Sequence, residues 1–135
     1  MRAADGLVVN LVDLPGYGYA RRSKAERVAW GALIEGYLLG RASLRAVVVI
    51  IDARRGVEQA ERDLFELVAA PPRTRRPPVA VLIAATKLDK VAASARKPLL
   101  TRLAREAAAP VVGFSAKDGT GREELWRRIR AVVTT

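Results

Sequence analysis

The sequence predicts an α/β fold with a mainly parallel sheet flanked by four helices. Three observations indicate it: short apolar runs, amphipathic stretches between them, and regular alternation of the two along the chain. The runs lie near residues 7–13, 46–52, 79–85 and 110–114 and are rich in Val, Ile and Leu. Because they do not alternate polar with apolar residues, they are typical of parallel strands buried on both faces. We therefore expect strand–helix units in one domain over residues 1–135.

The stretches between the runs have the spacing of helices. The first is marked by an apolar series at i, i+3, i+4, i+7 and i+8, namely Trp30, Leu33, Ile34, Tyr37 and Leu38. The second and third end before Pro71 and Pro110, because proline cannot continue a helix. Thr120 and Glu123 form a capping box at the start of the fourth. The proline-flanked, arginine-rich stretch 73–76 predicts an exposed loop.

Composition and charge exclude several classes of site. The chain has no cysteine and no histidine, so disulfides, thiolate metal sites and imidazole catalysis are excluded. No apolar run approaches the roughly 18 residues needed to cross a bilayer, and we expect a cytoplasmic protein without a membrane partner. The net charge of +10, from 24 basic and 14 acidic residues, favours an anionic partner such as RNA, and no DNA partner is predicted. The alternative is an arginine-rich surface that only faces water.

Polar side chains follow each predicted strand. Asp13, Asp52, Thr86 and Ser115 stand at or just after the ends of the four apolar runs. The carboxyl ends of parallel strands meet at one edge of a sheet, where ligands of open α/β folds bind. The sequence therefore predicts a binding site at this edge.

Three of these segments resemble, in order, the motifs of GTP-binding domains. Asp13 and Gly16 match D-x-x-G. In such domains the carboxylate holds Mg²⁺ through a water, and the glycine amide meets the γ-phosphate because no Cβ blocks its approach. The alternative is an ordinary turn at the end of a strand, since Asp, Pro and Gly are common in turns.

The other two motifs concern the guanine base. Thr86, Lys87 and Asp89 match N/T-K-x-D, in which the carboxylate accepts two hydrogen bonds from guanine and the lysine stem covers the base. The motif S-A-K is matched by Ser115, Ala116 and Lys117, and its alanine amide donates to guanine O6. A solvated charged loop and a strand-to-helix turn are the alternatives. Three such motifs after three buried strands, in order, favour the binding of guanine nucleotide.

The stretch L-V-D-L-P-G-Y-G-Y-A at 11–20 resembles a signature of the EngB (YihA, YsxC) family of bacterial GTPases, and Thr86–Lys90 and Ser94–Lys97 fit that family too. The resemblance covers essentially the whole chain. It implies a P-loop NTPase G domain that binds GTP or GDP with Mg²⁺. It also implies a role in assembly of the large ribosomal subunit, with rRNA as partner, and a link to normal cell division and septation.

One departure concerns the phosphate end of the site. None of the ten glycines is followed by lysine, so G-x-x-x-x-G-K-S/T does not occur in these residues. The expected domain is therefore a partial G domain without the first strand, P-loop and switch I. We assign no catalytic residue and expect no GTP hydrolysis, because phosphoryl transfer depends on those groups. The alternatives are a basic module that contacts rRNA or ribosomal protein without nucleotide, and a product without function.

The same departure gives an expectation about the sheet. In GTP-binding domains the P-loop strand lies between the strands that correspond here to residues 7–13 and 46–51. Without it, these two segments either stay about two strand spacings apart, ~9.5 Å, or close up and pair directly. The first outcome leaves backbone edges without partners, so we expect poor stability or aggregation through them.

Overall fold

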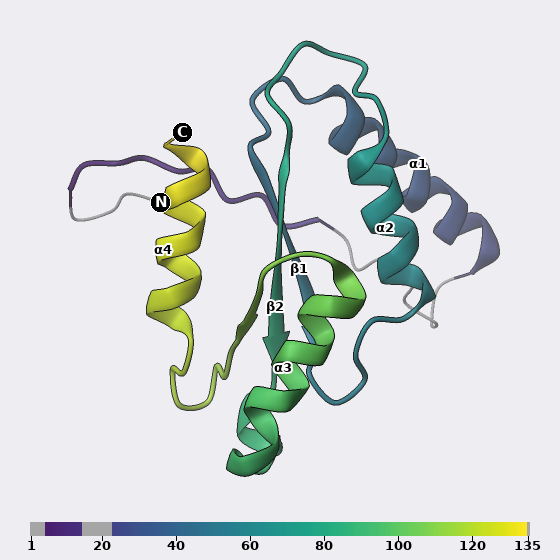
Figure 1. Cartoon of the computed structure of the whole chain (residues 1–135). Helices are drawn as coiled ribbons and strands as arrows, with labels where there is room; N and C mark the ends of the chain where they lie inside the picture. Colours follow the sequence, from purple (N-terminus) through teal and green to yellow (C-terminus); the bar gives the residue numbers. More distant parts are fainter. Residues whose placement is uncertain (1–4, 15–22, 135) are drawn as a thin grey trace.

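The computed structural model describes residues 5–14 and 23–134, and it contains a parallel sheet in the order β1-β2-β3. The strands are β1 (Ala46–Asp52), β2 (Ala80–Thr86) and β3 (Val111–Gly113). Helix α4 (Arg122–Val133) lies on one side of the sheet, and the other helices lie on the opposite side (Figure 1). The predicted α/β class, with a parallel sheet and four helices, is confirmed, and three of the four predicted strands lie within one residue of their expected starts.

The register of the sheet brings polar residues together at one edge. β1 pairs with β2 from Ala46 opposite Ala80 to Asp52 opposite Thr86, and β2 pairs with β3 over three residues. Both long strands therefore end in a polar side chain at the same level. This edge is the one at which the sequence predicts a site.

The core lies between the sheet and α3 (Ala93–Ala107). Leu103 of α3 is fully buried against apolar side chains of β1 and β2. The other buried members of this cluster are Val49, Ile51, Ala53, Ile83 and Ala85. Burial of a Leu or Ile side chain contributes about 1.5–3 kcal/mol to the stability of the fold. This contribution holds α3 against the sheet.

Helices α1 (Lys24–Gly40) and α2 (Gln59–Ala69) pack against each other. Ser23 caps α1 by accepting a hydrogen bond from the amide of Glu26 at 3.1 Å. In the predicted apolar face of α1, Leu38 is 1% exposed but Leu33 is 63% exposed. The buried face is therefore narrower than the spacing suggests, since only one side of α1 meets the rest of the protein. Among the described helices, none combines the length and apolarity needed to cross a bilayer.

The predicted capping box at Thr120 and Glu123 is wrong. Helix α4 begins after Gly121, whose φ is 82°, and no side chain caps it. A Cβ at Gly121 would stand 1.9 Å from the carbonyl oxygen of Gly113. The helix begins where the chain passes this close to β3. A local sequence pattern cannot indicate such a tertiary contact.

The predicted strand near 7–13 is also not formed. In this described segment only Val8 makes an isolated bridge, and the remaining residues have no strand pairing. A groove of about 1020 Å³ separates residues 10–14 from β1, and α1 and α2 contribute to its lining. Of the two expected outcomes, an open gap and direct pairing, the structure has the gap. An extended segment needs a neighbouring strand to satisfy its amides and carbonyls, and among the described residues of this segment only Val8 has a bridge partner.

Candidate functional site

Three loops meet at the carboxyl edge of the sheet, and backbone hydrogen bonds join them. The amide of Ala53 donates to the carbonyl of Thr86 at 2.9 Å, which links the ends of β1 and β2. The amide of Leu88 donates to the carbonyl of Phe114 at 3.1 Å, which links the loops after β2 and β3. The structure therefore brings together two of the three predicted motifs.

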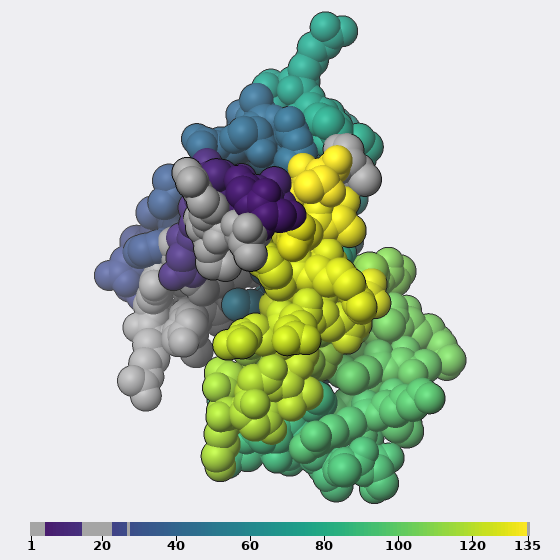
Figure 2. Space-filling view, turned by 90° about the vertical axis from the view of Figure 1, so that its left-hand side faces the viewer, coloured from purple at the N-terminus to yellow at the C-terminus, as the bar shows by residue number. Residues whose placement is uncertain are grey.

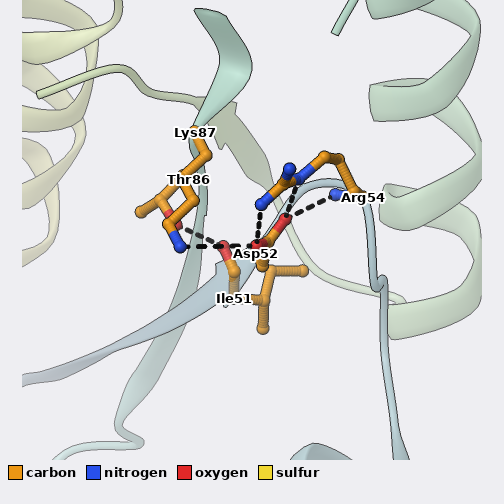
Figure 3. Close-up of polar contacts among 5 residues, drawn as sticks. All are labelled: Ile51, Asp52, Arg54, Thr86 and Lys87. Carbon is orange, nitrogen blue, oxygen red and sulfur yellow. Dashed lines mark hydrogen bonds and ion pairs between the residues drawn. The ribbon is translucent and has the colours of Figure 1, made fainter. Parts of the chain in front are cut away.

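The loop after β2 is held in a specific conformation. The Thr86 hydroxyl donates to the carbonyl of Ile51 at 2.9 Å, so it is used to hold the two strand ends together (Figure 3). Lys87 has a φ of 59°, a left-handed conformation that costs a non-glycine residue roughly 1–2 kcal/mol. Leu88 is buried directly after it. The buried Leu88 and the bond to Phe114 offset that cost and direct Asp89 towards the loop after β3.

Asp89 and Ser115 form the centre of the site. The Ser115 hydroxyl donates to Oδ1 of Asp89 at 2.8 Å, and Ser115 is 0% exposed. It is the only fully buried polar residue among those that the structure describes. A carboxylate has two oxygens that each accept two hydrogen bonds, so Asp89 keeps capacity for a ligand. Ser115 thus acts as a support for the carboxylate.

The loop that carries Ala116 and Lys117 is closed at its base. The Gly119 amide donates to the Ser115 carbonyl at 2.9 Å, and the Ser115 amide donates to the Thr120 carbonyl at 3.0 Å. Asp118 accepts a hydrogen bond from the Thr120 amide at 2.9 Å. Hydrogen bonding by Thr120 lowers the pKa of Asp118 below its ordinary value. Ala116 and Lys117 are exposed at the tip of this closed loop.

Asp52 adds a charged group that the sequence analysis named without assigning a role. Its carboxylate accepts from the Arg54 amide at 2.9 Å and from the Arg54 guanidinium at 3.1 and 2.9 Å (Figure 3). The ammonium of Lys87 lies 3.8 Å from the same carboxylate. The hydrogen bond from the Arg54 side chain holds the pKa of Asp52 at about 2. Arg54 was missed by sequence reasoning; an arginine two residues after a strand-ending aspartate is the signal that could have indicated it.

Of the D-x-x-G motif, Asp13 lies apart from these contacts. Asp13 is exposed and lines the groove beside β1, and it makes none of the hydrogen bonds that join the three loops. Gly16 lies outside the described residues. Within residues 5–14 and 23–134, no group of three or more acidic side chains could hold a metal ion.

Comparison with solved structures shows which proteins share this fold. The fold matches a probable GTP-binding protein EngB with a TM-score of 0.67 at 19% identity, over 90% of this chain and 76% of that one. It also matches the cytosolic domain of the T. maritima FeoB iron transporter in a GDP form, with a TM-score of 0.62 at 29% identity, over 98% of this chain and 47% of that one. The fold is that of the G domains of P-loop GTPases.

Curated sequences identify the relatives. The probable GTP-binding protein EngB of Anaeromyxobacter dehalogenans (strain 2CP-C) is 40% identical over 134 residues, which are 97% of this chain and 59% of the relative. The EngB protein of Symbiobacterium thermophilum is 42% identical over 128 residues, 91% of this chain and 52% of the relative. The chain is a relative of the EngB GTP-binding proteins, as its motifs predict, and it spans little more than half of their length. No family model matches the chain.

Proposed function

We propose that this chain carries the guanine-recognition part of an EngB-type G domain. The hydrogen bond between Ser115 and Asp89 is the observation that supports this best, because it joins two of the three motifs through a buried hydroxyl. A loop whose charges only faced water would not need a fully buried serine to hold its carboxylate. The domain that we propose extends over residues 1–135.

The chemistry of the site suits guanine. The Asp89 carboxylate would accept hydrogen bonds from the N1 and N2 donors of the base, a pattern that adenine does not offer. Hydrogen bonds to a charged group contribute about 1.5–3 kcal/mol each. The Lys87 side chain is 61% exposed, so its stem is free to lie along the base. The Ala116 amide, at the tip of the loop after β3, would donate to O6, and Thr86 and Lys117 would flank the base.

The phosphate end of the site receives less support. By resemblance, Asp13 would hold Mg²⁺ through a water and Gly16 would approach the γ-phosphate. The printed sequence has no G-x-x-x-x-G-K-S/T, and the described residues supply one exposed carboxylate there. We therefore infer weak binding of GTP and GDP through the base, and no hydrolysis by these 135 residues.

In biological terms, we propose a role in assembly of the large ribosomal subunit, with rRNA as the partner and a link to cell division and septation. This proposal rests on the resemblance to EngB, and the net charge of +10 supports an anionic partner. The charge also supports a second function, a basic module that contacts rRNA without nucleotide.

Titration with a fluorescent guanine nucleotide separates the two functions. The 135-residue protein should bind it saturably, GDP should compete and ADP should not. Asp89→Asn should shift preference from guanine towards xanthine nucleotides, because an amide can donate to the extra carbonyl of xanthine. Asp63→Asn, on the exposed face of α2, is the matched control and should bind as the wild type does. Absence of saturable binding, with RNA binding intact, would favour the basic module.

A further inference from the structure

Five arginines cluster at the end of the sheet opposite the guanine site. We call them the arginine cap: Arg41, Arg45, Arg73, Arg75 and Arg76. The first two lie between α1 and β1, and the other three lie between α2 and β2. Since β1 and β2 are parallel and start in register, these two connections lie side by side. Figure 1 shows both at the top of the molecule, and Figure 2 shows the loop before β2 projecting there beside the segment that follows α1.

Hydrogen bonds join the two connections into one surface. The amide of Arg73 donates to the carbonyl of Leu39 at 2.8 Å, and the guanidinium of Arg76 donates to the carbonyl of Arg41 at 2.9 Å. The guanidinium of Arg45 donates to the carbonyl of Ala42 at 3.0 Å. Four prolines, at 71, 72, 77 and 78, stiffen the longer connection. The cap is therefore held in place before a ligand arrives, which lowers the entropy lost on binding.

The charge of the cap is hardly compensated. No aspartate or glutamate occurs from residue 36 to 51 or from 67 to 88. Across the described residues, the one ion pair of the cap joins Arg73 to Glu35 at 3.4 Å. On α3 and α4, by contrast, carboxylates pair with three of the arginines, namely Arg102, Arg128 and Arg130. The cap is therefore a patch of positive charge that few carboxylates offset, and such a patch attracts anions.

The chemistry of the cap indicates phosphate groups. All five of its cations are arginines, and a guanidinium presents a planar fork that binds phosphate through two parallel hydrogen bonds. The Tyr37 ring lies under Arg41 at 5.8 Å, so the cap offers charge and no open aromatic platform for bases. None of the large exposed apolar side chains of the described residues belongs to the cap. Proteins that lie on a membrane surface insert such side chains, so RNA fits better than a lipid surface.

We propose that the arginine cap binds the phosphate backbone of folded RNA, independently of base sequence. The proposal rests on the proposed function in taking RNA as the partner, and it assigns the contact to this end of the sheet instead of to α3 and α4. The seven-residue strands β1 and β2 separate the cap from the guanine site by about 20 Å at 3.3 Å per residue. RNA and nucleotide can therefore bind at the same time.

The test compares two triple variants of the whole chain that remove the same charge. Arg41→Gln, Arg73→Gln and Arg75→Gln change exposed members of the cap and leave Arg45 and Arg76, which hold the loops. Arg102→Gln, Arg105→Gln and Arg127→Gln form the matched control on exposed positions of α3 and α4. Binding of a fluorescein-labelled RNA hairpin is followed by anisotropy between 50 and 200 mM KCl, and circular dichroism checks folding.

At the middle of the KCl range, the cap variant should bind the RNA hairpin about tenfold more weakly than the wild type, or weaker still. Its slope of log affinity against log salt should fall by about 2–3, as expected when three phosphate contacts are lost. The control should lose less than threefold. Equal losses of RNA affinity in both variants would contradict the assignment of the contact to the cap, while RNA would remain the partner. No RNA binding by the wild type would refute the partner itself. If the cap variant bound RNA as the wild type does but lost binding to phosphatidylserine vesicles, the cap would be a membrane-binding surface instead.

Discussion

The hydroxyl of Ser115 donates a hydrogen bond of 2.8 Å to the carboxylate of Asp89, across 26 residues of sequence. The donor is fully buried and the acceptor is partly exposed. One end of the bond is thus fixed by the core while the other remains open to a ligand. Ser115 can therefore control the position of the Asp89 carboxylate without contacting a ligand itself.

Substitution of Ser115 by alanine should therefore reduce guanine binding. Loss of the hydroxyl leaves the Asp89 carboxylate without its support, and a lost hydrogen bond to a charged group costs about 1.5–3 kcal/mol. We expect an affinity for a fluorescent guanine nucleotide roughly tenfold lower or more. Ser94→Ala, at an exposed position of α3, serves as the control. If both variants bound like the wild type, Ser115 would have no positioning role.

The ion pair of Asp52 should be visible in its titration. Its carboxyl should titrate at about 2, below the ordinary value of 3.8, when followed by carbon NMR. Because the pKa in the folded state is depressed, the stability contributed by this group is present above about pH 4. It is lost as the pH falls towards about 2.

Arg54→Gln should raise the titration midpoint of Asp52 towards 3.8, because the side-chain hydrogen bond of Arg54 is the largest cause of the depression. Arg55→Gln is the matched control: Arg55 is exposed and donates only its backbone amide, to the carbonyl of Asp52 at 3.0 Å. A midpoint that stays at about 2 in the Arg54 variant would contradict this assignment of cause.

Two glycines with the same backbone conformation should respond differently to alanine. Gly119 and Gly121 both have a φ of 82°, but a Cβ meets nothing within 4 Å at Gly119 and meets the Gly113 carbonyl oxygen at 1.9 Å at Gly121. Gly119→Ala should cost only the left-handed conformation, about 1–2 kcal/mol. Gly121→Ala should cost clearly more, since β3 or α4 must shift. Urea denaturation measures both, and equal losses would argue against the close approach.

The edge of the described sheet at β1 should promote self-association. Ile50 is 70% exposed towards the groove, whereas Ile51 is 3% exposed in the core. Ile50→Lys should lower light scattering at high protein concentration while leaving the free energy of unfolding within about 0.5 kcal/mol. Ile51→Lys should unfold the protein, because it buries a charge. A soluble monomeric wild type with a cooperative midpoint at ~45–65 °C would show that the edge is harmless.

Much of the fold and of the base site could be predicted because the signals are local. Runs such as 46–52 form strands from their own Val and Ile residues, and the motif at Thr86–Asp89 follows its strand directly. The parallel arrangement then places the motif residues at one edge. Residues 7–13 show the limit of such signals, since that run is also rich in apolar residues and still forms no strand beyond the bridge at Val8. Strand propensity is realised only when a neighbour completes the hydrogen bonds.

The sequence by itself determined the class of fold, the order of the motifs and the excess of arginine. Only the tertiary structure decided that Ser115 supports Asp89, that Arg54 pairs with Asp52, and that arginines from two distant connections share one end of the sheet. The physical reason is the range of the forces. Backbone conformation and hydrophobic periodicity act over a few residues, whereas a hydrogen bond or a field of charges depends on distances that exist only after the strands have paired.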